Sequence, residues 1–557
     1  MSALPYSYHT FIFPFIWKTS KEIVRDDFEK ILSVGRRWLD ISWKSEKVRD
    51  EVENQQEWFQ EYAAFQYFTK SANNIIFNTK GDDVVRCFEY YKHKGEYVIS
   101  KEGHDYRLVT NNIRLNVYDI GIAVLIFELE NHEYKNLDDV NIINEFGRRI
   151  NFPFLMSSGS HILCADKITV SFDDLSFTED YFSTIQNTGN NTDYIKEHIA
   201  MNYVMRPIQE LLDGKGEDNG GYKVTANEEH SNTNNFYIKP CVDDRMFVCC
   251  LVRDDDYSDK IKKFNKNKGE YNYLSECYDR EEKGLDIDLY KLLYVEKDAS
   301  CQSATMRHEL LKRSVYDRWI DWGTIHGVTH HSLICLTSAY EGIINSVINP
   351  FLTQYVQIAV LTVVQRAVIL LLSDEAAEVA NGFAGEDEIT QEEIKSIERL
   401  QARYVTAQNQ LLLSEVTAQE QGVEIYEMLQ EQLYIKKNMD DLHSEIGNLR
   451  DVADIANSRL ERANDEQRLI NDRKLMEMQN KQKEIQEQLE KEEEKRINSF
   501  SIWISILFII EPFALMITSK EDRNQGILWF FLTLIALVVL YKLNIGGKNG
   551  KKNRNKK

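Results

Sequence analysis

The sequence lacks the short motifs that mark the common enzyme classes. It contains no phosphate-binding Walker loop, no GxSxG nucleophile elbow, no HExxH metal motif and no GxGxxG dinucleotide fingerprint. Each motif works by holding a nucleophile, a metal ligand or a glycine-rich phosphate cradle at one spacing. We therefore expect that the protein is not an enzyme, and we predict no catalytic residue.

Cysteine is sparse and irregularly spaced. The 8 cysteines are scattered along the chain without a CxxC pair. Disulfide frameworks and zinc ribbons both need cysteines at regular spacings, so the pattern argues against either and is typical of a reduced, cytosolic chain. His326, His330 and His331 lie close together in the sequence but lack a carboxylate at metal-site spacing, so we expect no zinc there.

We also expect no cleavable leader, and the chain has no excess of basic residues. Residues 3–17 are aromatic, contain two prolines and have neither a charged start nor a small-residue cleavage site, which is unlike a signal peptide. The formal net charge is −22 and the pI is about 5.1. A chain this acidic does not attract a phosphate backbone by its overall charge, so we expect no direct binding of nucleic acid.

Two apolar runs lie close to the C-terminal end. Residues 499–518 form the first, which Glu511 and Pro512 interrupt, and residues 527–543 form the second. A helix needs about 20 mostly apolar residues to cross a bilayer, and these runs approach that length. We predict a transmembrane hairpin of two helices over residues 499–545.

Charge asymmetry predicts the orientation of this hairpin. The tail, residues 546–557, is strongly basic, whereas the connector 519–526 balances two basic residues with two acidic ones. Because basic flanking segments stay on the cytoplasmic side, we expect the tail and the whole chain before residue 499 to be cytoplasmic.

The cytoplasmic part divides into three blocks. Residues 1–300 mix alternating apolar runs with short helical patterns, which predicts an α+β domain. Residues 301–384 are its helical part. The run 355–373 within them nears membrane length, but Arg366 interrupts it, and an arginine at mid-bilayer costs about 2.5 to 3.5 kcal/mol. We expect this run to be a buried helix rather than a third span.

The third block, residues 385–498, has almost no glycine or proline and is rich in Glu, Gln, Lys and Leu. Apolar and small residues step by four and three along one seam, which predicts a long coiled-coil stalk. Because the seam contains alanines, neighbouring helices can approach closely, so we expect a homo-oligomer. The alternative is a long solvated helix with charged faces. The seam residues are Ile446, Leu449, Ala453, Ala456, Leu460, Ala463 and Ile470, followed after a shift by Met478, Ile485 and Leu489.

Two charged runs are candidates for ligand binding. Arg148 and Arg149 end a helix predicted over residues 137–150, and a guanidinium binds phosphate through two parallel hydrogen bonds and stacks on a purine. Asp243, Asp244 and Arg245 precede an apolar strand, where carboxylates suit ribose hydroxyls or an amino group. For both runs the alternative is an ion pair or a structural turn.

Trp319 and Trp322 are further candidates, for stacking on a base. Their helical spacing with Ile320 is more typical of the interior, so we expect both tryptophans to be core residues.

The first apolar run carries a polar stripe. Asn498, Ser501 and Ser505 share one face of an ideal helix, and Glu511 falls about 120° away from it. Pro512 removes a backbone hydrogen bond and bends a helix, so the stripe and Glu511 can line one lumen across the bend. A ring of carboxylates attracts cations, and we predict that these five residues form a pore. The alternative places Glu511 at the outer interface, in contact with water.

From about residue 385 onward, the architecture resembles the CorA family of divalent-cation channels. The features that carry this resemblance are the long helix continuous with the first span, the short outer connector and the basic tail. The family's Gly-Met-Asn signature at the outer end of the first span is absent, and ALMITSKEDRNQG stands in its place. The resemblance therefore does not carry the family's usual magnesium selectivity.

Upstream phrases resemble the large divergent branch of CorA-like proteins from Bacteroidetes-type bacteria, some of them associated with type III CRISPR systems. The phrases are HTFIFPFIW, NEFGRRI, DDRMFVCC, DRWIDWGTIHGVTHHSLICLT and SEVTAQEQGVEIYEMLQEQL. This resemblance implies a pentameric channel in the bacterial inner membrane. It also implies that the cytoplasmic domain senses a nucleotide second messenger, an adenylylated S-adenosylmethionine, and that the channel acts in antiviral defence with Mg²⁺ as a permeant or bound ion.

Two other functional classes stay open. One is a housekeeping magnesium or divalent-cation transporter, against which the missing Gly-Met-Asn signature speaks. The other is a membrane-anchored coiled-coil scaffold, against which the polar stripe and Glu511 speak.

Overall fold

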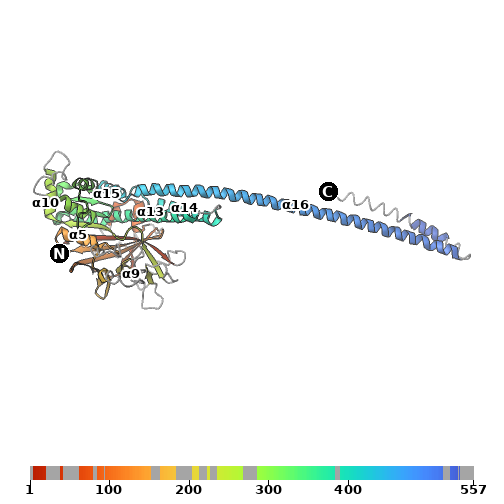
Figure 1. Ribbon diagram of the computed structural model, residues 1–557, viewed down its shortest axis with the longest axis horizontal. Coiled ribbons are helices and arrows are strands. Elements are labelled where there is room, and N and C mark those ends of the chain that lie inside the picture. Colours follow the sequence, from red (N-terminus) through yellow and green to blue (C-terminus); the bar gives the residue numbers. More distant parts are fainter. Residues whose placement is uncertain are drawn as a thin grey trace. The chain divides into compact units, whose positions relative to one another are not determined.

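The computed structural model describes two compact units, Met1–Ala456 and Asn457–Lys557. The first is an α+β unit and the second is helical (Figure 1). This confirms the predicted succession of an α+β region and a long helical part. The described residues are 4–19, 38–41, 62–79, 84–92, 94–151, 163–183, 204–212, 223–225, 235–266, 285–382, 389–518, 527–536 and 538–539.

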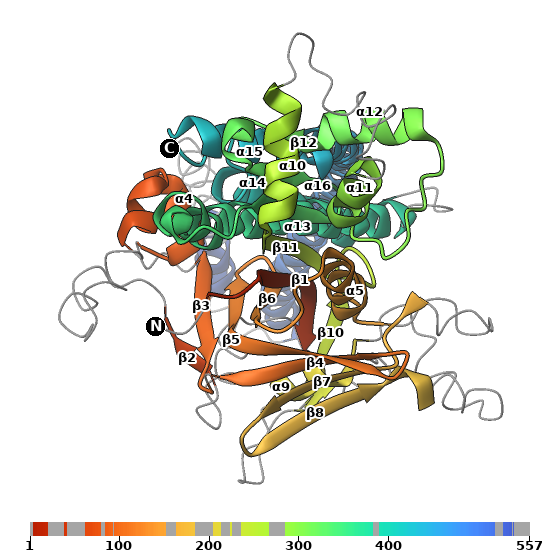
Figure 2. The same ribbon diagram turned by 90° about the vertical axis from the view of Figure 1, so that its left-hand side faces the viewer.

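A mixed sheet organises the first unit (Figure 2). Its described path runs β12-β13-β14-β11-β1-β6-β5-β4-β7-β8, with β10 and β9 branching from β1, and β3 and β2 from β5. Neighbouring strands are antiparallel except for the parallel pairs β11–β14 and β9–β10. The strands are β1 Ser7–Thr19, β2 Trp38–Asp40, β3 Val85–Tyr90, β4 Gly95–Lys101, β5 His104–Tyr118, β6 Ile122–Asn131, β7 Lys167–Phe172, β8 Leu175–Asp180, β9 Lys223–Thr225, β10 Asn235–Pro240, β11 Phe247–Arg253, β12 Val315–Tyr316, β13 Ile325–Val328 and β14 Ser332–Thr337.

Helices cover both faces of this sheet. Alternate residues of a strand point to opposite faces, and in β1 both sets contain buried apolar residues. Phe11, Phe13 and Phe15 belong to the main core cluster, which includes residues of α5 and α11. The other face of β1 packs against α13. The helices are α4 Lys70–Phe77, α5 Leu137–Gly147, α9 Arg206–Leu212, α10 Asp255–Lys266, α11 Leu285–Tyr294, α12 Ala304–Ser314, α13 Val356–Gly382, α14 Gln391–Gln410, α15 Glu420–Gln432 and α16 Ile435–Thr518.

The apolar run around α13 is buried inside the first unit. Among the described residues, one helical stretch, Glu341–Gly382, is long and apolar enough to cross a membrane, and 78% of its apolar window is buried. Its polar interruptions have partners. Gln365 Nε2 donates to the Leu411 carbonyl at 3.0 Å, and Arg366 Nη2 donates to His330 Nε2 at 2.7 Å. The prediction of a buried helix is therefore confirmed.

The block predicted as a stalk contains three helices. Thr390 opens α14 with a capping box that involves Glu393, and α15 and α16 follow. The seam is buried only at its start: Ile446, Leu449 and Ala456 are 4% to 8% exposed within the first unit. In the second unit, the seam residues from Ala463 to Leu489 are exposed in the single chain. The first part of the seam therefore packs within its own unit, and the later part has no partner among the described residues.

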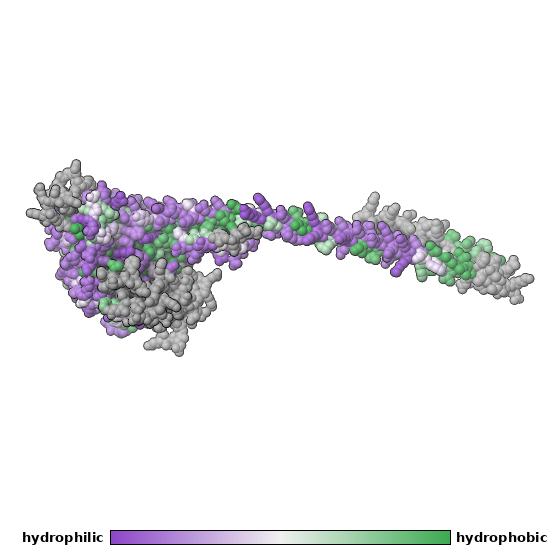
Figure 3. Space-filling view, viewed as in Figure 1, coloured by the Kyte–Doolittle hydropathy of each residue, from purple (hydrophilic) through white to green (hydrophobic). Residues whose placement is uncertain are grey.

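Exposed apolar residues gather on α16 between residues 497 and 510, as the hydrophobic surface in Figure 3 shows. Residues 506–510 are five consecutive apolar residues, 42% to 63% exposed. A shorter apolar helix, Ile527–Ala536, follows. The connector 519–526 and the tail 546–557 lie outside the described residues. The two-helix hairpin remains a prediction.

Lysine substitution at two seam alanines separates packing inside the first unit from assembly. Ala456→Lys puts a charge at a buried position, so the free energy of unfolding of the first unit should fall by about 2 kcal/mol. Ala463→Lys changes an exposed position, so unfolding should stay as in wild type while an oligomer built on the seam should shrink. Urea unfolding and size-exclusion chromatography measure the two effects. Equal unfolding of both variants would contradict the burial of Ala456, and unchanged size of the Ala463 variant would remove this part of the seam from assembly.

Candidate functional site

The five residues predicted to bind a ligand lie together in the structure. Arg148 and Arg149 follow α5, whose first turn is capped by the Asn136 side chain. Arg149 and Arg245 form an isolated antiparallel bridge just before β11. Backbone hydrogen bonds on both sides of this bridge hold residues 148–150 against residues 244–246. The two charged runs, far apart in the sequence, thus form one cluster.

Ion pairs within this cluster use both carboxylates. Arg149 Nη1 lies 3.1 Å from Asp244 Oδ2, and Arg245 Nη2 lies 2.7 Å from Asp243 Oδ2. Burial alone would raise the pKa of Asp243, but the hydrogen bond with Asp244 and the charge of Arg245 hold that pKa well below its usual range. Burial and the hydrogen bond with Asp243 raise the pKa of Asp244 to about 6. This is the ion-pair arrangement that stood as the alternative to ligand binding.

Arg148 is a buried cation without a bonded carboxylate among the described residues. Its side chain is 2% exposed, and Nη2 donates to the Val295 carbonyl at 3.3 Å. Nε and Nη1 have no hydrogen-bond partner in the described part of the chain. Burial, together with the charges of Arg245 and Arg149, lowers the pKa of Arg148 to about 9. Within the described residues, the cluster therefore has unbonded N–H donors that could bind an anion.

The space beside this cluster is small. A cavity of about 30 Å³ is lined by Arg245, Arg366, His330 and His331, among others. His330 Nδ1 lies 2.9 Å from the Gln432 carbonyl and therefore donates to it, which leaves Nε2 to accept from Arg366. Burial and the charges of Arg148 and Arg245 lower the pKa of His331 to about 3, so this histidine is neutral. The cavity has room for about one water molecule or a monatomic ion.

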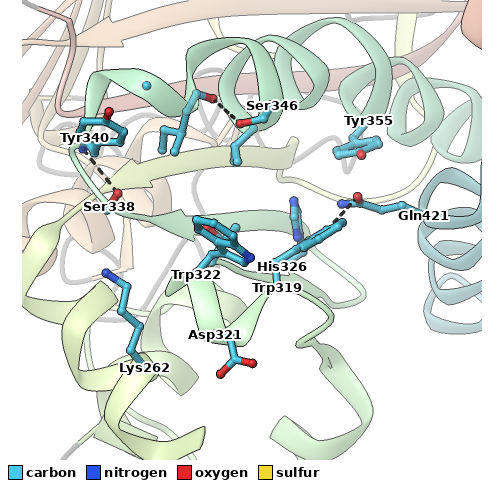
Figure 4. A pocket seen from close by; sticks show the side chains of 14 residues that line it. Lys262, Trp319, Asp321, Trp322, His326, Ser338, Tyr340, Ser346, Tyr355 and Gln421 are labelled. Carbon is cyan, nitrogen blue, oxygen red and sulfur yellow. Dashed lines mark hydrogen bonds between the residues drawn. The ribbon is translucent and has the colours of Figure 1, made fainter. Parts of the chain in front are cut away.

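A second, much larger pocket of about 580 Å³ lies elsewhere in the first unit (Figure 4). We call it the aromatic pocket. Its lining comes from α10, the ends of β13 and β14, α15 and four short helices, which are η4 Ile320–Trp322, η5 Glu341–Ile343, η6 Ile344–Ile348 and η7 Phe351–Tyr355. Pockets that hold drug-sized ligands measure roughly 300 to 1,000 Å³. This pocket therefore has the size of a small-molecule site.

Three exposed aromatic side chains line the aromatic pocket. Trp319 is 41% exposed, Trp322 is 74% exposed and Tyr340 is 70% exposed. The prediction that both tryptophans are core residues is wrong. The reason is that the helical stretch is a single 3₁₀ turn rather than a longer helix: Trp322 ends η4, Trp319 directly precedes it, and both border the pocket.

Glycine and proline shape the walls that hold these aromatics. Gly323 ends η4 with φ +69°, and an added Cβ there would lie 2.7 Å from the Ser258 carbonyl oxygen. A Cβ on Gly342 would collide with the Tyr340 ring. Pro350 stands between the two π-helical turns η6 and η7, and because it cannot donate a backbone hydrogen bond it suits this irregular stretch.

His326 lies beneath the aromatic pocket. It is 2% exposed, and neither ring nitrogen has a hydrogen-bond partner in the described part of the chain. Its ring packs against Tyr316, Phe351 and Tyr355 at centroid distances of 6.0, 6.3 and 5.7 Å. Burial lowers the pKa of His326 to about 4, so the ring is neutral near pH 7. Sequence reasoning considered His326 only as a metal ligand and missed this position under a pocket.

The predicted pore residues lie on α16 in the second unit. Asn498, Ser501 and Ser505 are helical, and Ser505 Oγ donates to the Ser501 carbonyl at 2.8 Å. Glu511 and Pro512 also belong to α16, but their side chains lie outside the described residues. The pore lining stays a prediction.

Comparison with known proteins finds no relative of this chain. No family model matches it, and neither does a curated protein or a solved structure.

Acid should destabilise the first unit because its buried histidines are neutral. The pKa of His326 falls to about 4 on folding, so the unfolded chain binds one more proton below pH 6.5 and stability is lost as the pH drops toward 4. His326→Gln should reduce this slope by up to about 1.4 kcal/mol per pH unit. Urea unfolding at pH 7, 6 and 5 measures it. The pKa of Asp244 rises on folding, so protonation of this carboxyl group favours the folded state as the pH drops. This contribution is the same in variant and wild type and cancels when their slopes are compared. His104→Asn, at an exposed position, is the control. Identical slopes for wild type and His326→Gln would contradict a neutral, buried His326.

Proposed function

We propose that this protein is an oligomeric membrane channel whose first unit binds a nucleotide-type ligand and thereby controls a pore formed by its C-terminal helices. The observation that carries the proposal is α16. This one helix contains seam residues packed within the first unit and a fully apolar, exposed stretch near its end. In the cell such a channel would leak the bacterial inner membrane in antiviral defence, as the CorA-like resemblance implies.

The apolar end of α16 supports a membrane location. A helix that is apolar on every side fits the interior of a bilayer or of a larger assembly, because in water it leaves a large apolar surface solvated. Residues 506–510 present such a surface over more than one turn. The apolar helix Ile527–Ala536 would form part of the second span.

The polar residues of α16 support a pore rather than a simple anchor. Ser501 and Ser505 share a stripe with Asn498 on a helix whose other residues in this stretch are mostly apolar. In a bilayer, polar side chains favour the inside of an oligomer, where they contact one another or water. A ring of Glu511 carboxylates would then draw cations to the lumen. A scaffold gives no role to these residues.

Removing the hairpin gives the first test of the proposal. A chain that lacks residues 499–545 should leave the membrane fraction and become soluble, whereas the full chain should resist extraction by carbonate. A full chain that is extracted by carbonate would contradict insertion and leave the scaffold as the better proposal.

Charge substitution at Glu511 tests the pore. Glu511→Gln removes one negative charge per subunit, so ion flux into liposomes in the presence of adenine nucleotides should lose its preference for cations. Glu511→Lys should block cations or favour anions. Glu494→Gln, on the same helix before the apolar run, is the matched control and should behave as wild type. If all three variants pass the same ions at the wild-type rate, Glu511 does not line the pore.

A further inference from the structure

We propose that the aromatic pocket binds a planar heteroaromatic ring by stacking, and that the occupied pocket acts on α16 through α15. The binding half of this proposal stands by itself, whereas the second half rests on the proposed function. The ligand class follows from three features of the pocket: exposed aromatic faces, few charges in the lining, and a histidine beneath it that has no hydrogen-bond partner among the described residues.

The aromatic side chains supply the stacking surfaces. Trp322 of η4 and Trp319, the residue before η4, line one side of the pocket, and Tyr340 and Tyr355 lie across from them (Figure 4). Exposed aromatic surface of this extent is costly in water, and a planar ring that stacks on it removes that cost. Base-on-aromatic stacking also tolerates different rings, because every base has a π face.

The charge of the lining favours a neutral ring over a polyphosphate. Among the described lining residues there is no arginine, and the one lysine, Lys262, lies 3.0 Å from Asp259. Asp321 adds a negative charge at the same pocket. Anion-binding sites instead gather guanidinium groups, as the cluster around Arg148 does.

His326 supplies hydrogen-bonding capacity that the protein leaves unused. A neutral imidazole has one donor and one acceptor nitrogen, and neither is bonded within the described residues. A buried polar group without a partner is costly, so a ligand or water that reaches it is favoured. A heteroaromatic ring with a donor and an acceptor on its edge, as in a nucleobase, meets this requirement.

The same wall of the pocket is bonded to α15. Trp319 Nε1 donates to Gln421 Oε1 at 2.9 Å, and the neighbouring Arg318 pairs with Glu420 at 2.6 Å and with Glu424 at 2.8 Å. A ring that stacks on Trp319 therefore changes a side chain that is tied directly to α15.

The other end of α15 adjoins α16. The Gln432 carbonyl accepts from His330, and only Leu433 and Tyr434 separate α15 from α16. Tyr434 has a left-handed backbone with φ +57°, so the link is a tight turn. Displacement of α15 by a ligand would consequently be passed to the start of α16.

The aromatic pocket and the arginine cluster are separable sites. His326 lies on β13, whereas His330 and His331 lie in the turn before β14. The six residues of β14 span about 20 Å, so the sites lie at opposite ends of this hairpin. A cavity of about 30 Å³ at the cluster also excludes a heteroaromatic ring.

Nucleoside binding by the full chain in nanodiscs tests the first half. The probes are adenosine, guanosine, cytidine and uridine, measured by equilibrium dialysis. At least one should bind, Trp322→Ala should weaken that binding about 10-fold or more, and Trp322→Phe should restore most of it because stacking is kept. Phe182→Ala changes an exposed aromatic outside the pocket and is the control. No binding up to millimolar nucleoside, or equal binding by wild type and Trp322→Ala, would overturn the site.

Hydrogen exchange tests the second half. The nucleoside that binds should slow amide exchange in residues 420–456 of wild type, and Arg318→Gln should keep the binding while losing this slowing. Unchanged exchange in wild type on binding would overturn the coupling. If binding and exchange behave as expected but no variant conducts ions, the channel proposal fails while this site stands. If nucleotides open a channel in the Trp322→Ala variant as in wild type, the coupling of this site to α16 fails while the channel stands.

Discussion

The hydrogen bond between Arg366 and His330 is the contact on which the arrangement of the first unit depends. Arg366 lies on the long buried helix α13, and His330 lies in the turn of the β13–β14 hairpin. Because His330 also donates to the Gln432 carbonyl, the same imidazole joins helix, sheet and the end of α15. The preceding residue of α13, Gln365, donates to the Leu411 carbonyl and the Tyr426 hydroxyl. Two polar residues in an apolar helix thus hold α14, α15 and the sheet in place.

This arrangement explains why a helix of membrane composition belongs inside a folded unit. A buried guanidinium or amide is costly without partners, and here each has a partner that only the folded unit supplies. The same partners position α15 beside β13, where Gln421, Trp319 and Trp322 border the aromatic pocket. The core contacts of α13 and the geometry of the pocket are therefore parts of one network.

The second unit presents the opposite physical situation. Its last described turns expose apolar side chains on all sides, and its seam residues beyond Ala463 are solvated in the single chain. In the proposed channel, lipid and further copies of α16 would cover these surfaces. In the arginine cluster of the first unit, the charged groups are likewise only partly matched by partners. Two of its cations are neutralised by Asp243 and Asp244, whereas Arg148 keeps unbonded donors within the described residues.

The sequence by itself determined the division into an α+β region and a long helical part, because composition and periodicity change sharply near residue 385. It also determined the burial of α13, since an arginine in the middle of an apolar run is tolerated more readily in a protein core than in lipid. Only the tertiary structure decided that Arg149 meets Asp244, 95 positions away, and that Trp319 and Trp322 face a pocket. The reason is that spacing along one element shows which side chains share a face, whereas long-range packing decides what that face meets.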